Sequence, residues 1–154
     1  MSKPLSEIKL AFGSDHAGFE LKEELREYIK TKVAGVEDFG TYSLDSTDYP
    51  DYAHRVATAV ENGNADFGIL ICGSGNGINM AANKHAGIRS ALSWNKEVAE
   101  LARLHNNANV LALPARFIST DEGRKILDAF LSADFEGGRH QKRVEKIALA
   151  EKIS

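Results

Sequence analysis

The chain has 154 residues, of which 43% are hydrophobic and 27% are charged, with a formal net charge of −3. This size and composition predict one globular domain over residues 1–154, and the mild acidity excludes a general attraction to nucleic acid or to an anionic membrane. Cys72 is the single cysteine, which excludes an internal disulfide and a cysteine-rich zinc site. Residues 1–8 are polar, and no apolar run approaches the roughly 20 residues that cross a bilayer. We therefore expect a soluble, cytoplasmic protein with no secretory leader.

Short apolar runs alternate with segments whose apolar residues recur at helical spacing. The runs predict strands over residues 8–12 (closed by Gly13), 36–39 (ended by Gly40), 67–72, 90–93 and 109–113. The helical spacing predicts helices around residues 21–33, 52–60, 80–82, 98–105, 126–131 and 141–152. Asn95 can cap one helix, and Ser119 with Glu122 forms a capping box for another. This alternation predicts a three-layer α/β/α Rossmann-like sandwich with a five-stranded parallel sheet, in which 67–72 is the central strand.

The last predicted helix, over 141–152, carries Val144, Ile147, Ala148 and Glu151 at helical spacing, which gives a mostly apolar stripe. One interpretation is that this stripe packs on its own domain. The other is that the break at Gly137-Gly138 lets the helix leave the domain and lie along a partner subunit. We expect the second, because five strands and their helices can already cover the core.

Ligands in such sheets bind beyond the carboxyl ends of the strands. The first reactive segment expected there is Gly13-Ser14-Asp15-His16-Ala17-Gly18, directly after the first strand. An Asp-His pair can bind sugar hydroxyls and phosphate oxygens. The alternative is that Ser14 or Asp15 only caps the following helix.

The second segment is Cys72-Gly73-Ser74-Gly75-Asn76-Gly77, after the central strand. Its alternate glycines let backbone N–H groups converge on an anion, and a helix N-terminus there predicts a thiol pKa below the ordinary value of about 8.5. The alternative is that Cys72 is inert packing. Ile78-Asn79 is not the Lys-Ser/Thr of a P-loop, and Ile78 is not the arginine of a phosphatase loop. A dinucleotide fingerprint would by preference follow the first strand.

The third group comprises His105-Asn106, Arg116 and the basic run 137–143. Arg139 and Arg143 are four residues apart, so on a helix they share a face and can grip one phosphate. The alternatives are a solvated basic surface and, for His105, a cation that finishes its helix. His54 and His85 are assigned no role.

Taken together, these segments resemble the type B ribose-5-phosphate isomerases of the ribose/galactose isomerase family. The individual motifs are short, but their occurrence together and in order is highly specific. Besides residues 13–18 and 72–77, the resemblance includes Gly40-Thr41-Tyr42, Thr47-Asp48-Tyr49-Pro50, Ala81-Ala82-Asn83-Lys84, His105-Asn106-Asn107-Ala108-Asn109-Val110 and Glu136-Gly137-Gly138-Arg139-His140.

The resemblance implies a homodimer, which could pair into a tetramer, with two active sites that each use residues of both subunits. It implies a small phosphorylated sugar as substrate, no metal and no other cofactor. It also implies that Cys72 is the catalytic base, that Ser74 and the loop of Gly73, Gly75, Asn76 and Gly77 hold the enediolate, and that His105 opens the sugar ring. The implied ligands of the hydroxyls are Asp15, Tyr49 and Asn106, and those of the phosphate are His16, Arg116, Arg139 and Arg143.

Two positions refine this expectation. Some relatives carry a glutamate base where this chain has Ile78, so Cys72 is the evident base here. His105 and Arg139 favour ribose 5-phosphate over galactose 6-phosphate, while allose 6-phosphate and a tetrose phosphate stay open. The remaining alternative is a non-catalytic domain that binds a phosphosugar or nucleotide, which would have no use for Cys72 or His105.

Overall fold

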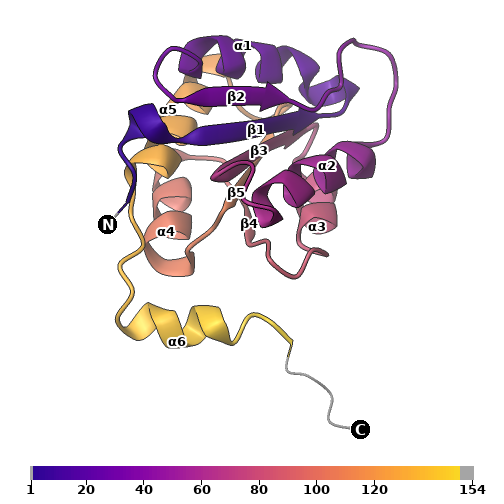
Figure 1. The fold of residues 1–154 in the computed structure, drawn as a ribbon. Helices are drawn as coiled ribbons and strands as arrows, with labels where there is room; N and C mark the ends of the chain where they lie inside the picture. The colour runs from indigo at the N-terminus through magenta and orange to yellow at the C-terminus, as the bar shows by residue number, and fades with distance from the viewer. Residues whose placement is uncertain (1, 150–154) are drawn as a thin grey trace, which may run out of the picture.

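The computed structural model describes residues 2–149, which form a parallel sheet between two layers of helices (Figure 1). The strands are β1 (Lys9–Ser14), β2 (Gly35–Asp38), β3 (Phe67–Cys72), β4 (Ser90–Leu92) and β5 (Val110–Pro114). The helices are α1 (Phe19–Ile29), α2 (Tyr49–Glu61), α3 (Asn76–Ala82), α4 (Lys96–Asn106), α5 (Thr120–Ser132) and α6 (Arg139–Glu145), with short 3-10 turns η1 (Leu5–Glu7) and η2 (His16–Gly18). None of these helices is long and apolar enough to cross a membrane.

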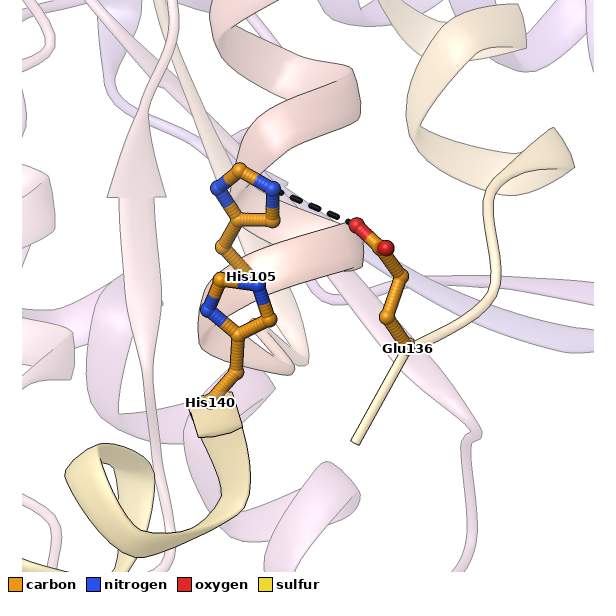
Figure 2. Close-up of side chains that lie close together, drawn as sticks. All are labelled: His105, Glu136 and His140. Atoms are coloured by element: carbon orange, nitrogen blue, oxygen red, sulfur yellow. Dashed lines mark ion pairs between the residues drawn. The ribbon is translucent and has the colours of Figure 1, made fainter. Parts of the chain in front are cut away.

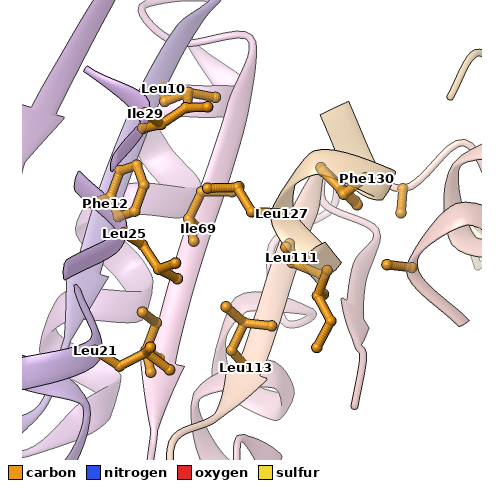
Figure 3. Packing of buried hydrophobic residues seen from close by; sticks show 14 of the residues in the cluster. Leu10, Phe12, Leu21, Leu25, Ile29, Ile69, Leu111, Leu113, Leu127 and Phe130 are labelled. Carbon is orange, nitrogen blue, oxygen red and sulfur yellow. The ribbon is translucent and has the colours of Figure 1, made fainter. Parts of the chain in front are cut away.

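Side chains along the central strand alternate between two cores, which is why the sheet is covered on both faces. Ile69 and Ile71 of β3 join α1, α4 and α5 in a core of large Leu, Ile and Phe side chains (Figure 3). Leu70 and Cys72 point to the opposite face, where α2 and α3 contribute mainly alanine, valine and isoleucine. The predicted three-layer α/β sandwich with five parallel strands is confirmed.

The strand order β2-β1-β3-β5-β4 decides where a crevice can form. From β1 the chain passes to β2 on one side and then returns to β3 on the other side of β1. In open α/β sheets this reversal creates a ligand crevice at the carboxyl ends of the two strands. Ser14, the last residue of β1, is level with Ile71, so the segment after β1 lies beside Cys72.

Predicted helix starts and strands agree with the structure where local signals were strong. The Asn95 side chain accepts from the Val98 N–H at 2.9 Å, and the Ser119–Glu122 capping box is present. Strand β3 spans the predicted residues 67–72. These predictions are reliable because each depends on residues that are only a few positions apart in the chain.

Several predicted ends were wrong, because contacts distant in sequence decide them. Gly13 does not close β1, since the Ser14 N–H donates to the Gly40 carbonyl and extends the strand. Helix α1 ends at Ile29, so Val33 lies beyond it, and α3 begins at Asn76, inside the glycine segment. β2 lies one residue earlier than predicted, and β4 and β5 differ by one residue at their ends.

The last helix differs most from its prediction. α6 begins at Arg139 and ends at Glu145, whereas 141–152 was expected; Glu151 and Lys152 lie outside the described residues. The helix ends because the N–H groups of Lys146 and Ile147 bond three residues back, to Arg143 and Val144, in tighter turns. Figure 1 shows α6 set apart from the sheet, beside α4 of its own chain. Its predicted packing on a partner subunit stays a prediction.

Candidate active site

A cavity of about 590 Å³ opens at the carboxyl ends of β1, β3 and β5, where the strand order predicts a crevice. Segments after three strands and the start of α2 therefore meet in one place. The residues that line it are Asp15, His16, Ala17, Tyr49, Cys72, Gly73, Ser74, Gly77, Arg116 and Phe117. Eight of these ten were predicted as site residues from the sequence.

Cys72 ends β3 and faces the α2–α3 layer, with 5% of its surface exposed. Burial raises the pKa of its thiol above the ordinary value, and the neighbouring Asp15 carboxylate raises it further. The backbone N–H groups of Ile78, Gly75 and Ser74 donate to the sulfur and act in the opposite direction. The prediction of a lowered Cys72 pKa was therefore wrong, because desolvation outweighs the loop's N–H groups.

The loop after Cys72 is built by glycines that admit neighbouring groups. Gly75 has φ 78°, a conformation that favours glycine, and it caps α3. A Cβ on Gly77 would lie 2.4 Å from the Tyr49 ring, so glycine lets this ring pack on the loop. Asn76 donates to the Ser74 hydroxyl from its backbone N–H (3.3 Å) and its side-chain amide (3.2 Å). Gly75 and Asn76 do not line the cavity; they support Cys72 and Ser74.

Two side chains after β1 combine structural and site roles. Asp15 accepts the Gly18 N–H at 3.1 Å, so it caps η2 as the alternative interpretation stated, and it also lines the cavity. The Nδ1 atom of His16 accepts from the Thr47 N–H at 3.2 Å. Because a backbone N–H can only donate, the neutral His16 ring carries its proton on Nε2, where it can donate to a ligand.

Arg116 enters the cavity from the loop after β5. Its N–H donates to the Gly73 carbonyl at 3.0 Å, and the Ala115 N–H donates to the Cys72 carbonyl at 2.9 Å. The Arg116 guanidinium lies against Gly73, whose missing side chain leaves room for it.

Phe117, which is 73% exposed, and Ala17 were not predicted as site residues. Their positions directly beside Arg116 and His16 were the available signal.

The remaining predicted residues, His105, Asn106, Arg139 and Arg143, do not line this cavity. Helix α4 runs back along the sheet and ends at Asn106, just before β5 begins at Val110. Cys72, in contrast, is level with Pro114 at the far end of β5. The four steps of β5 at about 3.3 Å each separate the two ends by roughly 13 Å. The predicted site is therefore divided between two edges of the sheet within one chain.

At the second edge, two histidine rings and a carboxylate lie close together (Figure 2). His105 Nε2 is 3.2 Å from Glu136 Oε1, and the His105 and His140 rings stack with centroids 4.1 Å apart. Desolvation lowers the pKa of His140 below its ordinary value; the neighbouring His105 and Arg139 lower it further, whereas Glu136 raises it. Arg139 and Arg143 both belong to α6, so they share one face as predicted.

A family model described as Ribose/Galactose Isomerase matches residues 10–147. The chain belongs to this family. It is 50% identical over 143 residues to ribose-5-phosphate isomerase B of Escherichia coli (strain K12), which covers 93% of this chain and 96% of that protein. The crystal structure of a ribose 5-phosphate isomerase from Thermotoga maritima has a TM-score of 0.89 and 51% identity, covering 92% of this chain and 97% of that one.

A second solved relative is ribose-5-phosphate isomerase B from Mycoplasma genitalium with bound ribulose-5-phosphate. It has a TM-score of 0.86 and 49% identity, covering 90% of this chain and 93% of that one. The resemblance inferred from the sequence motifs is confirmed, since each of these comparisons extends over nine tenths of the chain.

In this member of the ribose/galactose isomerase family, Ile78 occupies the position that the resemblance gives to a glutamate base in some relatives. Its side chain is fully buried beside Cys72, and its N–H donates to the sulfur. An isoleucine side chain cannot take a proton, so Ile78 cannot serve as the base.

The family motifs do not include a second histidine cluster that the structure reveals. His54 Nδ1 lies 2.7 Å from His85 Nε2, and His85 Nδ1 lies 2.8 Å from Glu61 Oε1. The other Glu61 oxygen accepts the Gly87 N–H at 2.9 Å, and this bond lowers the Glu61 pKa. The chain of contacts ties the end of α2 to the segment before β4, away from the cavity.

Proposed function

We propose that this chain is an aldose–ketose isomerase that interconverts ribose 5-phosphate and ribulose 5-phosphate with its own side chains and no cofactor. The observation that carries the proposal is the Cys72 sulfur, held by three backbone N–H groups in a cavity that also presents Asp15, His16 and Arg116. Relatives that match most of the chain and are named ribose-5-phosphate isomerase B support this substrate.

The reaction moves a proton between C2 and C1 of the open-chain sugar. The Cys72 thiolate takes the C2 proton of the aldose, which leaves an enediolate. A proton then passes from the C2 oxygen to the C1 oxygen, and the resulting thiol returns a proton to C1, which gives the ketose. The Ser74 hydroxyl and loop N–H groups stabilise the developing oxyanion. A raised pKa makes the thiolate a stronger base, although a smaller fraction of the free protein is ionised at neutral pH.

The rest of the cavity suits a small phosphosugar. Its volume of about 590 Å³ falls within the range of small-molecule sites, roughly 300–1,000 Å³. Asp15, directly after β1, and Tyr49, at the start of α2, bind sugar hydroxyls. Arg116 and the Nε2–H of His16 bind phosphate oxygens through directional donors.

A second copy of the chain supplies the remaining groups in this proposal. These groups lie at the opposite edge of their own sheet: Asn106, Arg139, Arg143 and His105, which is the proposed ring-opening residue. Two-fold pairing brings the edge of one subunit to the cavity of the other and completes two equivalent sites. Exposed Met80, Trp94 and Leu101 offer apolar surface for this homodimer, which could pair further into a tetramer.

A coupled assay of the purified protein tests the proposal. Ribose 5-phosphate should give the highest kcat/KM when compared with allose 6-phosphate, galactose 6-phosphate and a tetrose phosphate. A higher value for another sugar would reassign the substrate. Binding of ribose 5-phosphate without turnover of any of these sugars would instead support a non-catalytic phosphosugar-binding domain.

The proposed partners and compartment follow from the same chemistry. The small anionic substrate is held by local positive groups, and a net charge of −3 gives no general affinity for nucleic acid. A free cysteine as catalytic base suits the reducing cytoplasm, which is the compartment we propose.

A further inference from the structure

Three potential metal ligands converge at the end of α4, at the edge of the sheet opposite the cavity (Figure 2). One ligand atom each from His105, Glu136 and His140 lies within 4.8 Å of the others. Within residues 2–149, this is the one group of three such side chains that could hold a metal ion. Two imidazoles and a carboxylate form a donor set that zinc and related ions prefer.

The backbone holds the three residues together. The Glu136 N–H donates to the Leu104 carbonyl at 3.0 Å, which ties Glu136 to the turn that carries His105. Gly137 and Gly138 have φ values of 67° and 53°, and these turn the chain so that α6 begins over α4. The His140 N–H donates to the Gly137 carbonyl at 3.0 Å. Backbone hydrogen bonds therefore hold the three residues of the cluster close to one another.

We propose that His105, Glu136 and His140 bind one divalent transition-metal ion of the zinc class, with water as a fourth ligand. We further infer that the ion inhibits isomerisation by occupying His105 Nε2. The binding stands on the geometry alone, whereas the inhibition rests on the proposed function. The ion is a regulator or inhibitor in this proposal, so it does not serve as a cofactor.

The distances are compatible with such a site after a small movement. Tetrahedral zinc about 2.1 Å from each donor places the donors roughly 3.4 Å from one another. The His105–Glu136 pair, at 3.2 Å, already has this spacing. The two rings are within 13° of parallel, so their lone pairs cannot both point at one ion. His140, in the first turn of α6, must therefore turn its ring when the ion binds.

The surrounding charges limit which ions bind and how tightly. One carboxylate is too few for Mg²⁺ or Ca²⁺, which take mostly oxygen ligands, whereas imidazole suits Zn²⁺, Ni²⁺ and Cu²⁺. Arg139 and Arg143 share α6 with His140 and repel any cation. We therefore expect clear preference for zinc-class ions, with weaker binding than in a closed structural site.

Calorimetric titration with Zn²⁺ and Mg²⁺ tests the site without any substrate. The full chain carrying Cys72→Ala is used, because a thiolate is a competing zinc ligand. We expect one Zn²⁺ per chain, no Mg²⁺ response, and at least about a tenfold loss of Zn²⁺ affinity in Glu136→Gln and His140→Ala. His85→Ala is the matched control, because it removes a histidine from the other histidine–glutamate cluster, and it should keep the affinity.

The titration can overturn the site in three ways. These are no Zn²⁺ binding, an unchanged affinity in both site variants, or a loss in His85→Ala equal to the loss in His140→Ala. Circular dichroism spectra must match that of the parent, so that a loss reports the ligand and not the fold. Because substrate is absent, these outcomes are independent of the proposed function.

Inhibition is measured separately with ribose 5-phosphate. We expect Zn²⁺ to lower kcat/KM in the wild-type chain, EDTA to reverse the effect, and His140→Ala to need at least about tenfold more Zn²⁺. Equal zinc sensitivity of wild type and His140→Ala would overturn the inhibitory part, because it would assign the effect to Cys72. Absence of turnover without zinc would count against the proposed function. The metal site would then be tested by the titration alone.

Discussion

The two edges of the sheet carry the two halves of the proposed site, and they are built differently. At the carboxyl edge, Cys72 is buried, and backbone N–H groups from its own loop surround the sulfur. At the opposite edge, the amino edge, where the strands begin and α4 ends, the side chains of His105 and Glu136 are 36% and 51% exposed. Parallel strands gather whatever follows them at one edge, whereas helix ends return to the other. One chain therefore forms the cavity around Cys72 by itself, and in our proposal a second chain supplies the ring-opening group, His105.

The largest effect is expected from removing the group at the carboxyl edge. Cys72→Ala should lower kcat about 10²–10⁴-fold, because it deletes the general base. Binding of ribose 5-phosphate should be largely retained, since Asp15, His16 and Arg116 remain. Steady-state kinetics and calorimetry measure the two quantities. Near-full turnover, with the substitution verified by mass spectrometry, would remove Cys72 from the mechanism.

Subunit complementation tests whether the two edges meet between chains. Inactive Cys72→Ala and His105→Ala proteins are mixed under conditions that exchange subunits. Half the dimers are then mixed and hold one intact site, so activity should approach about one quarter of wild type per site. A labelled subunit proves that exchange occurred. No recovery despite exchange would mean that both residues act within one chain.

The arginines of α6 test the contribution of the amino edge to phosphate binding. Arg139→Ala and Arg143→Ala should each lower kcat/KM roughly ten- to a hundredfold, the equivalent of a charged hydrogen bond worth about 1.5–3 kcal/mol. Lys142→Ala, one residue away in the same helix, is the control and should change little. If both arginine variants match the parent protein, the basic run is only a solvated surface.

The pH dependence of kcat/KM should follow the buried thiol. The base is active when deprotonated and burial raises its pKa, so kcat/KM should increase up to about tenfold per pH unit from pH 7 to 9. The rate of Cys72 alkylation by iodoacetamide should rise over the same range. If kcat/KM does not change above pH 7, the thiolate is already formed in the free protein. That result would mean that the N–H groups of the loop lower the Cys72 pKa more than burial raises it.

Chelation should have the smallest effect. Exhaustive EDTA treatment should leave kcat/KM unchanged or slightly raised, because the proposed proton transfer uses only side chains and N–H groups. Metal analysis of the treated protein verifies removal. If EDTA abolishes activity and one added metal restores it, that metal ion is a cofactor. This result would contradict the metal-free mechanism.

Much of the site could be predicted because its residues follow predicted strands. Asp15 follows β1, Cys72 ends β3 and Arg116 lies in the loop after β5, so the parallel sheet brings them together. Phe117 was missed because its one signal, its place beside Arg116, does not distinguish a cavity wall from exposed surface. The His54–His85–Glu61 contacts were missed because they join residues up to 31 positions apart.

The sequence by itself determined the alternation of strands and helices, the capped helix starts and the family, because these depend on local spacing and short motifs. Only the tertiary structure decided the environment of individual groups. Lys22 looks like a helix-surface residue, yet it is fully buried, with its ammonium 2.8 Å from Asp38. Desolvation likewise reverses the expected pKa shift of Cys72. Burial and long-range contact are properties of the whole fold, so no local pattern contains them.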